Sequence, residues 1–147
     1  MLVHLHLYFI EAALLGAFMI AACLAVMLVE HPASGVRRRI GSALVRRGII
    51  GMAMGVTAVV LITSPWGRLS GAHMNPAVTL AFTLLGEVRP IDAVGYIAGQ
   101  FLGGIVGVLV CAAVFRRAIA HPSVGYIVTE PAIRPRGWQI AFAAELA

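Results

Sequence analysis

The sequence predicts an all-α membrane protein with three transmembrane helices and one shorter helix that enters the membrane without crossing it. Hydrophobic residues make up 61% of the 147 residues and charged residues only 12%, whereas soluble proteins carry about 25% charged residues. Three segments reach the roughly 20 residues needed to cross the hydrocarbon core, at residues 5–29, 48–66 and 91–115. Between the second and third of these segments, an Asn-Pro pair opens a short apolar run.

The first segment, residues 5–29, is interpreted as a retained helix rather than a signal peptide. No Lys or Arg precedes it, and its apolar stretch exceeds the roughly 7 to 15 residues of a signal peptide. It contains Glu11, and a central charge costs about 3 kcal/mol on insertion scales, so we expect this carboxylate to face the protein interior. Two roles are open from the residues alone: a proton or ion site, or an acceptor for backbone N–H groups.

Breaker residues divide the rest of the chain. The connection at residues 30–47 contains five arginines and is predicted to lie at the lipid headgroups. The second span, 48–66, ends at the cluster Ser-Pro-Trp-Gly-Arg of residues 64–68, which is expected to turn the chain back toward the membrane. After the third span, the proline-containing segment 116–136 is predicted to be irregular and outside the membrane.

The short helix is predicted at residues 76–86. Asn75 is a favourable N-cap residue, and Pro76 suits the first helical position, where no N–H is required. A helix that begins inside a membrane directs unpaired backbone N–H groups and a positive dipole end into the adjacent space. Such a helix start is tolerated only beside protein or a water-filled cavity.

Small residues recur at four-residue intervals in the third span and predict close helix packing. In lipid, small residues let helix backbones approach each other. In the third span, these residues are Gly95, Gly99, Gly103 and Gly107. We expect this row to seat the third span within the bundle, with a subunit contact as the alternative. Cys23 and Cys111 lack metal-ligand spacing and are interpreted as small buried apolar residues without a redox role.

The ten residues 70–79, Ser-Gly-Ala-His-Met-Asn-Pro-Ala-Val-Thr, resemble the first signature of the aquaporin (major intrinsic protein) family. The resemblance is to a bacterial-type member. It implies two inverted repeats, each of three spans and one half-helix, so the fold resembles an aquaporin-like half. Residues 1–136 correspond to the first repeat and residues 137–147 to the incomplete start of the second, truncated at the start of a fourth helix. Glu145 echoes Glu11 in the same local setting.

The resemblance also implies roles for individual residues in a pore. Asn75, followed by Pro76 and Ala77, would donate its amide NH2 to a solute, and Glu11 would accept hydrogen bonds from the re-entrant loop. A small residue at the filter position, Gly55 or Met54, would widen the selectivity filter enough for glycerol. Gln100 would bond across helices.

From the residues themselves, small side chains in the loop would let its backbone approach a pore. Gly71, Ala72 and His73 could then present a ladder of carbonyl acceptors. His73 has no Cys, Asp or Glu near it in sequence, so a structural loop contact is favoured over a metal ligand or proton relay.

The function expected from these features is a passive channel for water or small neutral solutes such as glycerol, completed by a second repeat. The first alternative is a truncated, non-conducting membrane fragment. The second is an ion-coupled transporter, which is disfavoured because Glu11 stands alone as an intramembrane acid. No nucleophile–base pair, carboxylate pair or metal set is present, so we predict that the protein is not an enzyme and needs no cofactor or metal. The resemblance further implies a homotetramer for the full-length form, in the bacterial plasma (inner) membrane.

The charge distribution conflicts with the orientation that the resemblance implies. All eleven basic residues are Arg, and the net charge is +5. We interpret them as contacts to lipid headgroups rather than to nucleic acid. With the N-terminus in the cytoplasm, nine arginines lie outside and only Arg68 and Arg89 inside, the reverse of the positive-inside rule.

Overall fold

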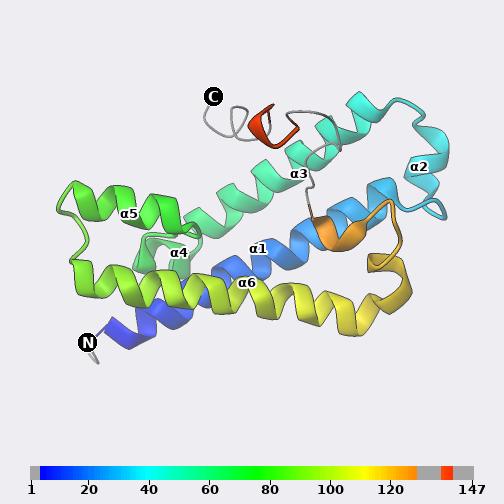
Figure 1. Cartoon of the computed structure of the whole chain (residues 1–147). Coiled ribbons are helices and arrows are strands. Elements are labelled where there is room, and N and C mark those ends of the chain that lie inside the picture. The colour runs from blue at the N-terminus through cyan, green and yellow to red at the C-terminus, as the bar shows by residue number, and fades with distance from the viewer. Residues whose placement is uncertain (1–3, 129–136, 141–147) are drawn as a thin grey trace.

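The computed structural model describes residues 4–128 and 137–140, and its long elements are three apolar helices (Figure 1). They are α1 (Leu5–Glu30), α3 (Ala43–Thr63) and α6 (Pro90–Ile119). Each is long and apolar enough to cross a membrane. No strand occurs within the described ranges. The predicted all-α fold with three membrane-spanning helices is confirmed.

Shorter helices lie between these spans and after the last one. They are α2 (Gly35–Arg39), α4 (Pro65–Ser70), α5 (Pro76–Leu84) and the 3₁₀ turn η2 (Gly125–Ile127). The sequence analysis did not predict α2 and α4, both of which begin at a serine cap. The hydroxyl of Ser34 accepts from Val36 N–H, and the hydroxyl of Ser64 accepts from Gly67 N–H at 3.0 Å.

Two spans are longer than the sequence suggested. The second begins at Ala43 rather than at residue 48, because Ser42 caps it through Val45 N–H. The third continues past the expected end at residue 115, with non-helical dihedral angles at Arg116 (φ 30°, ψ −95°) marking a kink. Arg47, Arg116 and Arg117 extend these helices with exposed side chains, which are long enough to reach the headgroup region, whereas Arg46 is buried and paired with Glu30. The half-helix α5 ends at Leu84, slightly before the predicted residue 86.

Helices α1 and α6 run parallel and form the closest pair in the fold (Figure 1). The glycines of α6 contact the backbone of α1 in steps of four residues. A Cβ at Gly103 would lie 1.9 Å from the Ala12 carbonyl oxygen, and one at Gly107 would lie 2.5 Å from that of Gly16. The glycine row therefore packs α6 against α1 inside the bundle.

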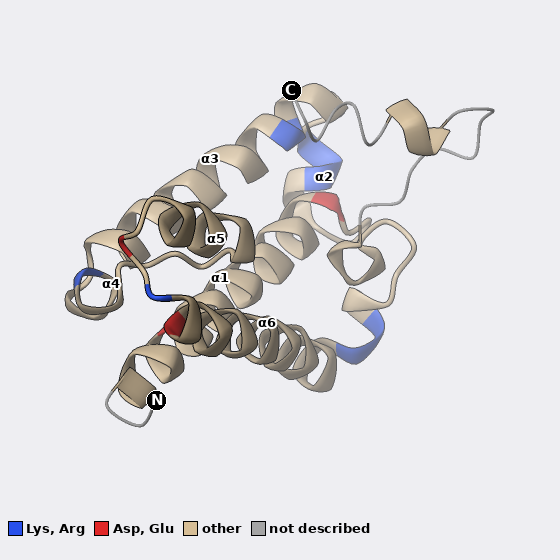
Figure 2. Cartoon of the chain, turned by 60° about the vertical axis from the view of Figure 1, so that its left-hand side comes forward, with Lys and Arg blue, Asp and Glu red and all other residues tan. Residues whose placement is uncertain are grey.

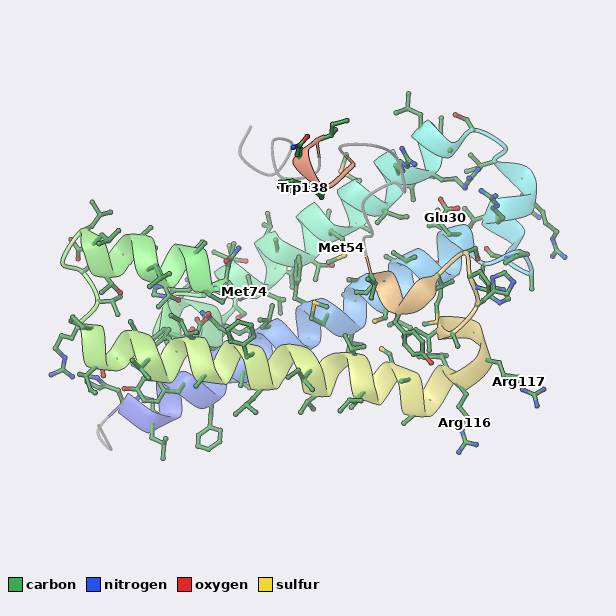
Figure 3. All side chains as sticks on the ribbon, viewed as in Figure 1. Glu30, Met54, Met74, Arg116, Arg117 and Trp138 are labelled. Carbon is green, nitrogen blue, oxygen red and sulfur yellow. The ribbon has the colours of Figure 1, made fainter. Side chains whose placement is uncertain are left out.

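Arginine positions are concentrated at the end of the long helices that carries α2, and others lie near α4 at the opposite end (Figure 2). At the α2 end, Glu30, the last residue of α1, binds Arg37 of α2 and Arg46 of α3, each at 3.0 Å. Arg46 is buried and also donates to the carbonyls of Ile40 and Gly41 at 2.8 Å. This clasp fixes the α1–α2–α3 connection. Arg116 and Arg117 lie at the same end (Figure 3).

Much of α3 and α5 is exposed although these helices are apolar. On α3, Met52 is 72% exposed and Val59 60%, and Arg46 is the one buried residue of that helix. In α5, only Thr79 is buried. An apolar helix face of this size needs lipid or further protein as a neighbour.

Candidate functional site

The site is built around the start of α5, where Asn75 is the capping residue. Its backbone is extended (φ −156°, ψ 126°), and its Oδ1 accepts from Ala77 N–H at 2.8 Å. Pro76 occupies the first helical position. Because the carbonyl oxygen of the side chain is used for the cap, the amide NH2 is the part of Asn75 that can donate elsewhere. Asn75 and Ala77 are exposed, and Pro76 is partly buried.

The loop before Asn75 has an unusual backbone. Gly71, Ala72 and Met74 have φ values of 91°, 45° and 46°, all in the left-handed region. For residues other than glycine this conformation costs about 1–3 kcal/mol each and persists only where the surroundings enforce it. Strong contacts must therefore hold residues 71–74 in place.

Glu11 supplies those contacts. It is fully buried on α1. Its Oε1 accepts from the Ser70 hydroxyl at 2.9 Å and from His73 N–H at 3.0 Å. Its Oε2 accepts from Met74 N–H at 2.8 Å and from the Gln100 amide at 2.9 Å. Each carboxylate oxygen thus binds two donors, and the geometry is that of an acceptor for the loop rather than of an open proton or ion site.

Three residues that the sequence analysis did not single out complete this network. The Gln100 amide also donates to Thr79 Oγ1 at 3.0 Å, and Tyr96 OH donates to the Ser70 carbonyl at 2.8 Å. Both Thr79 and Ser70 are buried. They are polar residues in an almost uncharged region, which is a signal that sequence reasoning could have used. Tyr96 lies one helical turn before Gln100 on α6 and carries no comparable signal.

His73 is packed into the same region. Its ring stacks on Phe82 with centroids 5.1 Å apart, and lies 4.9 Å from the ring of Tyr96. Its Nδ1 lies 3.1 Å from Thr79 Oγ1. Across residues 4–128 and 137–140, no group of three or more His, Cys, Asp or Glu side chains is arranged to hold a metal.

Every backbone N–H of residues 71–74 has a protein acceptor. Gly71 N–H donates to the Gly67 carbonyl and Ala72 N–H to the Ser70 hydroxyl, while the next two donate to Glu11. By contrast, the carbonyls of Gly71, Ala72 and His73 accept no hydrogen bond from any described residue. The loop therefore binds the protein through its donors and leaves its acceptors available.

A hollow of about 440 Å³ opens beside the start of α5. Pro76 and Gln100 line it together with apolar side chains of α1 and α6. Gln100 is fully buried, and its Oε1 has no hydrogen-bond partner in the described part of the chain.

The two filter candidates lie apart from this network. Both are on α3, where Figure 3 labels Met54, and a Cβ at Gly55 would have no heavy atom within 4 Å. Neither residue takes part in the hydrogen bonds that Glu11 accepts, which come from Ser70, His73, Met74 and Gln100. Glu145 lies outside the described residues.

Three apolar spans, together with a short helix that Asn75 caps, define an integral, multi-pass membrane protein. The sequence model described as "Major intrinsic protein" matches residues 9–134. The chain therefore belongs to the major intrinsic protein family, and the predicted family is confirmed. Members of this family are channels rather than enzymes, which confirms the prediction that the protein is not an enzyme.

Individual relatives match parts of the chain. Lens fiber major intrinsic protein of Gallus gallus is 36% identical over 88 residues, covering 53% of this chain and 33% of the relative. Aquaporin NIP2-1 of Oryza sativa subsp. japonica is 35% identical over 105 residues, covering 70% of this chain and 33% of the relative. Aquaporin Z of Photorhabdus laumondii is 33% identical over 89 residues, covering 60% of this chain and 36% of the relative. The chain thus spans about a third of the length of these curated relatives. No solved structure gives a significant match.

Proposed function

We propose that the protein supplies one repeat of a passive channel for water or small neutral solutes, glycerol among them. The observation that carries this proposal is the one-sided hydrogen bonding of residues 71–74. All four N–H groups bind the protein, and the carbonyls of residues 71–73 have no partner in the described structure. A row of free carbonyls at membrane depth is tolerable only where water or solute satisfies it.

Asn75 supplies the complementary donor. Its Oδ1 is held by Ala77 N–H, which orients the NH2 group away from the helix it caps. A solute oxygen can then accept from Asn75 and donate its hydrogen to a loop carbonyl. The positive end of the α5 dipole disfavours cations at this point, which supports neutral permeants.

Glu11 supports the passage without entering it. Four donors occupy its carboxylate oxygens, so it is placed as a structural anchor for the loop. A proton- or ion-coupled transporter would need a titratable group that is free to exchange its partners. This arrangement favours passive flux over coupled transport.

A complete pore needs more protein than the described helices provide. The exposed apolar faces of α3 and α5 and the hollow beside Pro76 leave the start of α5 uncovered on one side. We propose that a second repeat covers this side, from a longer chain or from an antiparallel copy. Gly55 would leave the filter wide, which favours glycerol as a permeant, and the assembled channel would be a homotetramer in a bacterial inner membrane.

Osmotic shrinkage of proteoliposomes tests conduction directly. Where an antiparallel copy supplies the second repeat, vesicles with the 147-residue chain should shrink faster than empty vesicles in a sucrose gradient, and should re-swell when glycerol is the osmolyte. Shrinkage no faster than that of empty vesicles would show that the chain by itself is a non-conducting fragment.

A pair of Asn75 variants separates the cap from the donor. Asn75→Asp keeps a capping oxygen but replaces the NH2 donor with a charged acceptor, whereas Asn75→Ala removes both. We expect both variants to lose at least tenfold in solute flux, and Asn75→Asp to retain the thermal stability of the parent. Normal flux through Asn75→Asp would contradict the assigned donor role.

A further inference from the structure

The only two cysteines of the chain meet across the seam between α1 and α6. Cys23 and Cys111 are 0% and 1% exposed and belong to one buried cluster with Met27, Ile119 and Val124. Both thiols are free and lie within this one cluster. The residues lie far apart in sequence, which is why spacing alone gave no sign of a pair.

The register of the two parallel helices explains this meeting. The carbonyls of Tyr8, Ala12 and Gly16 contact Gly99, Gly103 and Gly107 in turn. One turn further along both helices, the next contact is between the Ile20 carbonyl and Cys111 Sγ, at 4.0 Å. Cys111 therefore continues the glycine row on the face of α6 that packs against α1.

Cys23 faces the same seam from α1. It lies three residues after Ile20, and residues three apart share a helix face. Because the glycines bring the two backbones into contact just before this point, the sulfur atoms are held between two closely packed helices. Proximity here is imposed by the helix pair and does not require a loop to move.

We propose that Cys23 and Cys111 form an intramolecular thiol–disulfide site inside the membrane, open to small uncharged two-electron oxidants. In the reaction, the two S–H bonds break and one Sγ–Sγ bond forms. When hydrogen peroxide is the oxidant, it takes up the two hydrogens and two electrons, and its O–O bond breaks to give two water molecules. With the diazene reagent diamide, they reduce the N=N bond to a hydrazine.

The surroundings determine which oxidants can react. The seam is apolar, and charged species enter such an environment only at a high cost. Diamide and hydrogen peroxide are small and uncharged and can reach it from the lipid or through packing fluctuations. Oxidised glutathione is large and charged and is excluded. Buried thiols also react slowly, so oxidation is expected over minutes to hours rather than seconds.

Thiol counting on the full chain in isolated membranes tests the proposal. After treatment with diamide, the protein is denatured, and free thiols are labelled with a polyethylene glycol maleimide. We expect the parent to change from two labels to none while remaining a monomer on a non-reducing gel, and dithiothreitol to restore both labels. Oxidised glutathione should leave both thiols free.

Matched variants separate contact from simple reactivity. Cys23→Ser and Cys111→Ser should each keep their one remaining thiol free under the same treatment. A second control moves the α6 cysteine off the seam, by combining Cys111→Ser with Val110→Cys, because Val110 is 45% exposed. This variant should form no intramolecular disulfide.

Three results would overturn the proposal. The first is a parent that keeps two free thiols after prolonged treatment with diamide. The second is loss of the thiols only through dimers, which would indicate contact between molecules. The third is equal intramolecular cross-linking in the Val110→Cys variant, which would show that the seam does not select the pair.

Discussion

Gln100 Nε2 lies 2.9 Å from Glu11 Oε2, which places a buried polar contact between α1 and α6 beside the close backbone contacts of the glycine row. The same carboxylate holds the loop before α5 through His73 N–H and Met74 N–H. Glu11 therefore links the packing of the two long helices to the conformation of the re-entrant loop.

Removal of the Glu11 charge should destabilise the loop. In Glu11→Gln, an amide NH2 replaces one acceptor oxygen and faces two donors, and each buried donor left unpaired costs about 1–3 kcal/mol. We expect a clear drop in the thermal midpoint in detergent and faster cleavage of residues 71–74 by proteases. Glu87→Gln, at an exposed position, is the matched control and should behave like the parent. Equal stability of Glu11→Gln and Glu87→Gln would contradict the anchor role.

Adjacent glycines on α6 should respond in opposite ways to alanine. In Gly103→Ala the new Cβ would lie 1.9 Å from the Ala12 carbonyl oxygen, so α6 must move away from α1. We expect a loss of about 2–4 kcal/mol, similar to severe overpacking. In Gly104→Ala the nearest atom is Leu15 Cδ2 at 3.7 Å, an ordinary contact, and the better helix propensity of alanine adds up to about 1 kcal/mol.

Thermal unfolding of both variants in the same detergent gives the comparison. A midpoint for Gly103→Ala at or above that of Gly104→Ala would show that the close α1–α6 approach is not required for stability.

The arginine clasp at the end of α1 should be sensitive to the type of cation. Arg46 is buried and donates to Glu30 and to the carbonyls of Ile40 and Gly41. Lysine lacks the planar fork that serves these acceptors together. Arg46→Lys should therefore cost about 1–3 kcal/mol, measured as a lower unfolding midpoint. Arg47→Lys, at an exposed neighbouring position, should change the midpoint little, and a similar loss in both variants would argue against the clasp.

The orientation of the chain can be measured at its two ends. Family topology places the Arg37–Arg39 end outside the cell, whereas the positive-inside rule favours the reverse. Single cysteines at Ala33 and Glu87, both exposed, report on opposite ends when Cys23 and Cys111 are replaced by serine. We expect a membrane-impermeant maleimide to label the cysteine at Ala33 in intact cells and to leave the one at Glu87 unlabelled. The opposite pattern would show that arginine charge sets the orientation.

Hydropathy was sufficient to locate the three spans, because an uninterrupted apolar segment of this length has few alternatives to crossing a membrane. It did not locate α2, α4 or the early start of α3. Those depend on the hydroxyls of Ser34, Ser64 and Ser42 accepting a particular backbone N–H, which composition does not reveal. Propensity and capping rules place helix starts only to within a few residues.

The candidate site was predictable to a similar degree. Asn75 and Pro76 belong to residue types that begin helices, so the cap of α5 could be expected from the sequence. The partners of Glu11 could not, because they come from the end of α4, the loop and the middle of α6. The pairing of Cys23 with Cys111 depends on the same α1–α6 register. Contacts between distant segments follow from this packing, which the periodicity of a single helix does not specify.

Permeation past Asn75 requires that the start of α5 lies deep in the membrane and is hydrated. Spin labels on single cysteines at Ala77, Met52 and Ala33, with Cys23 and Cys111 replaced by serine, can be compared in lipid vesicles. Met52 is an exposed position in the middle of α3, and Ala33 lies in the α1–α2 connection. We predict that the label at Ala77 lies as deep as the one at Met52 but collides more often with a water-soluble nickel chelate. A label at Ala77 that lies at the headgroup depth of Ala33, or is as dry as the one at Met52, would contradict the account.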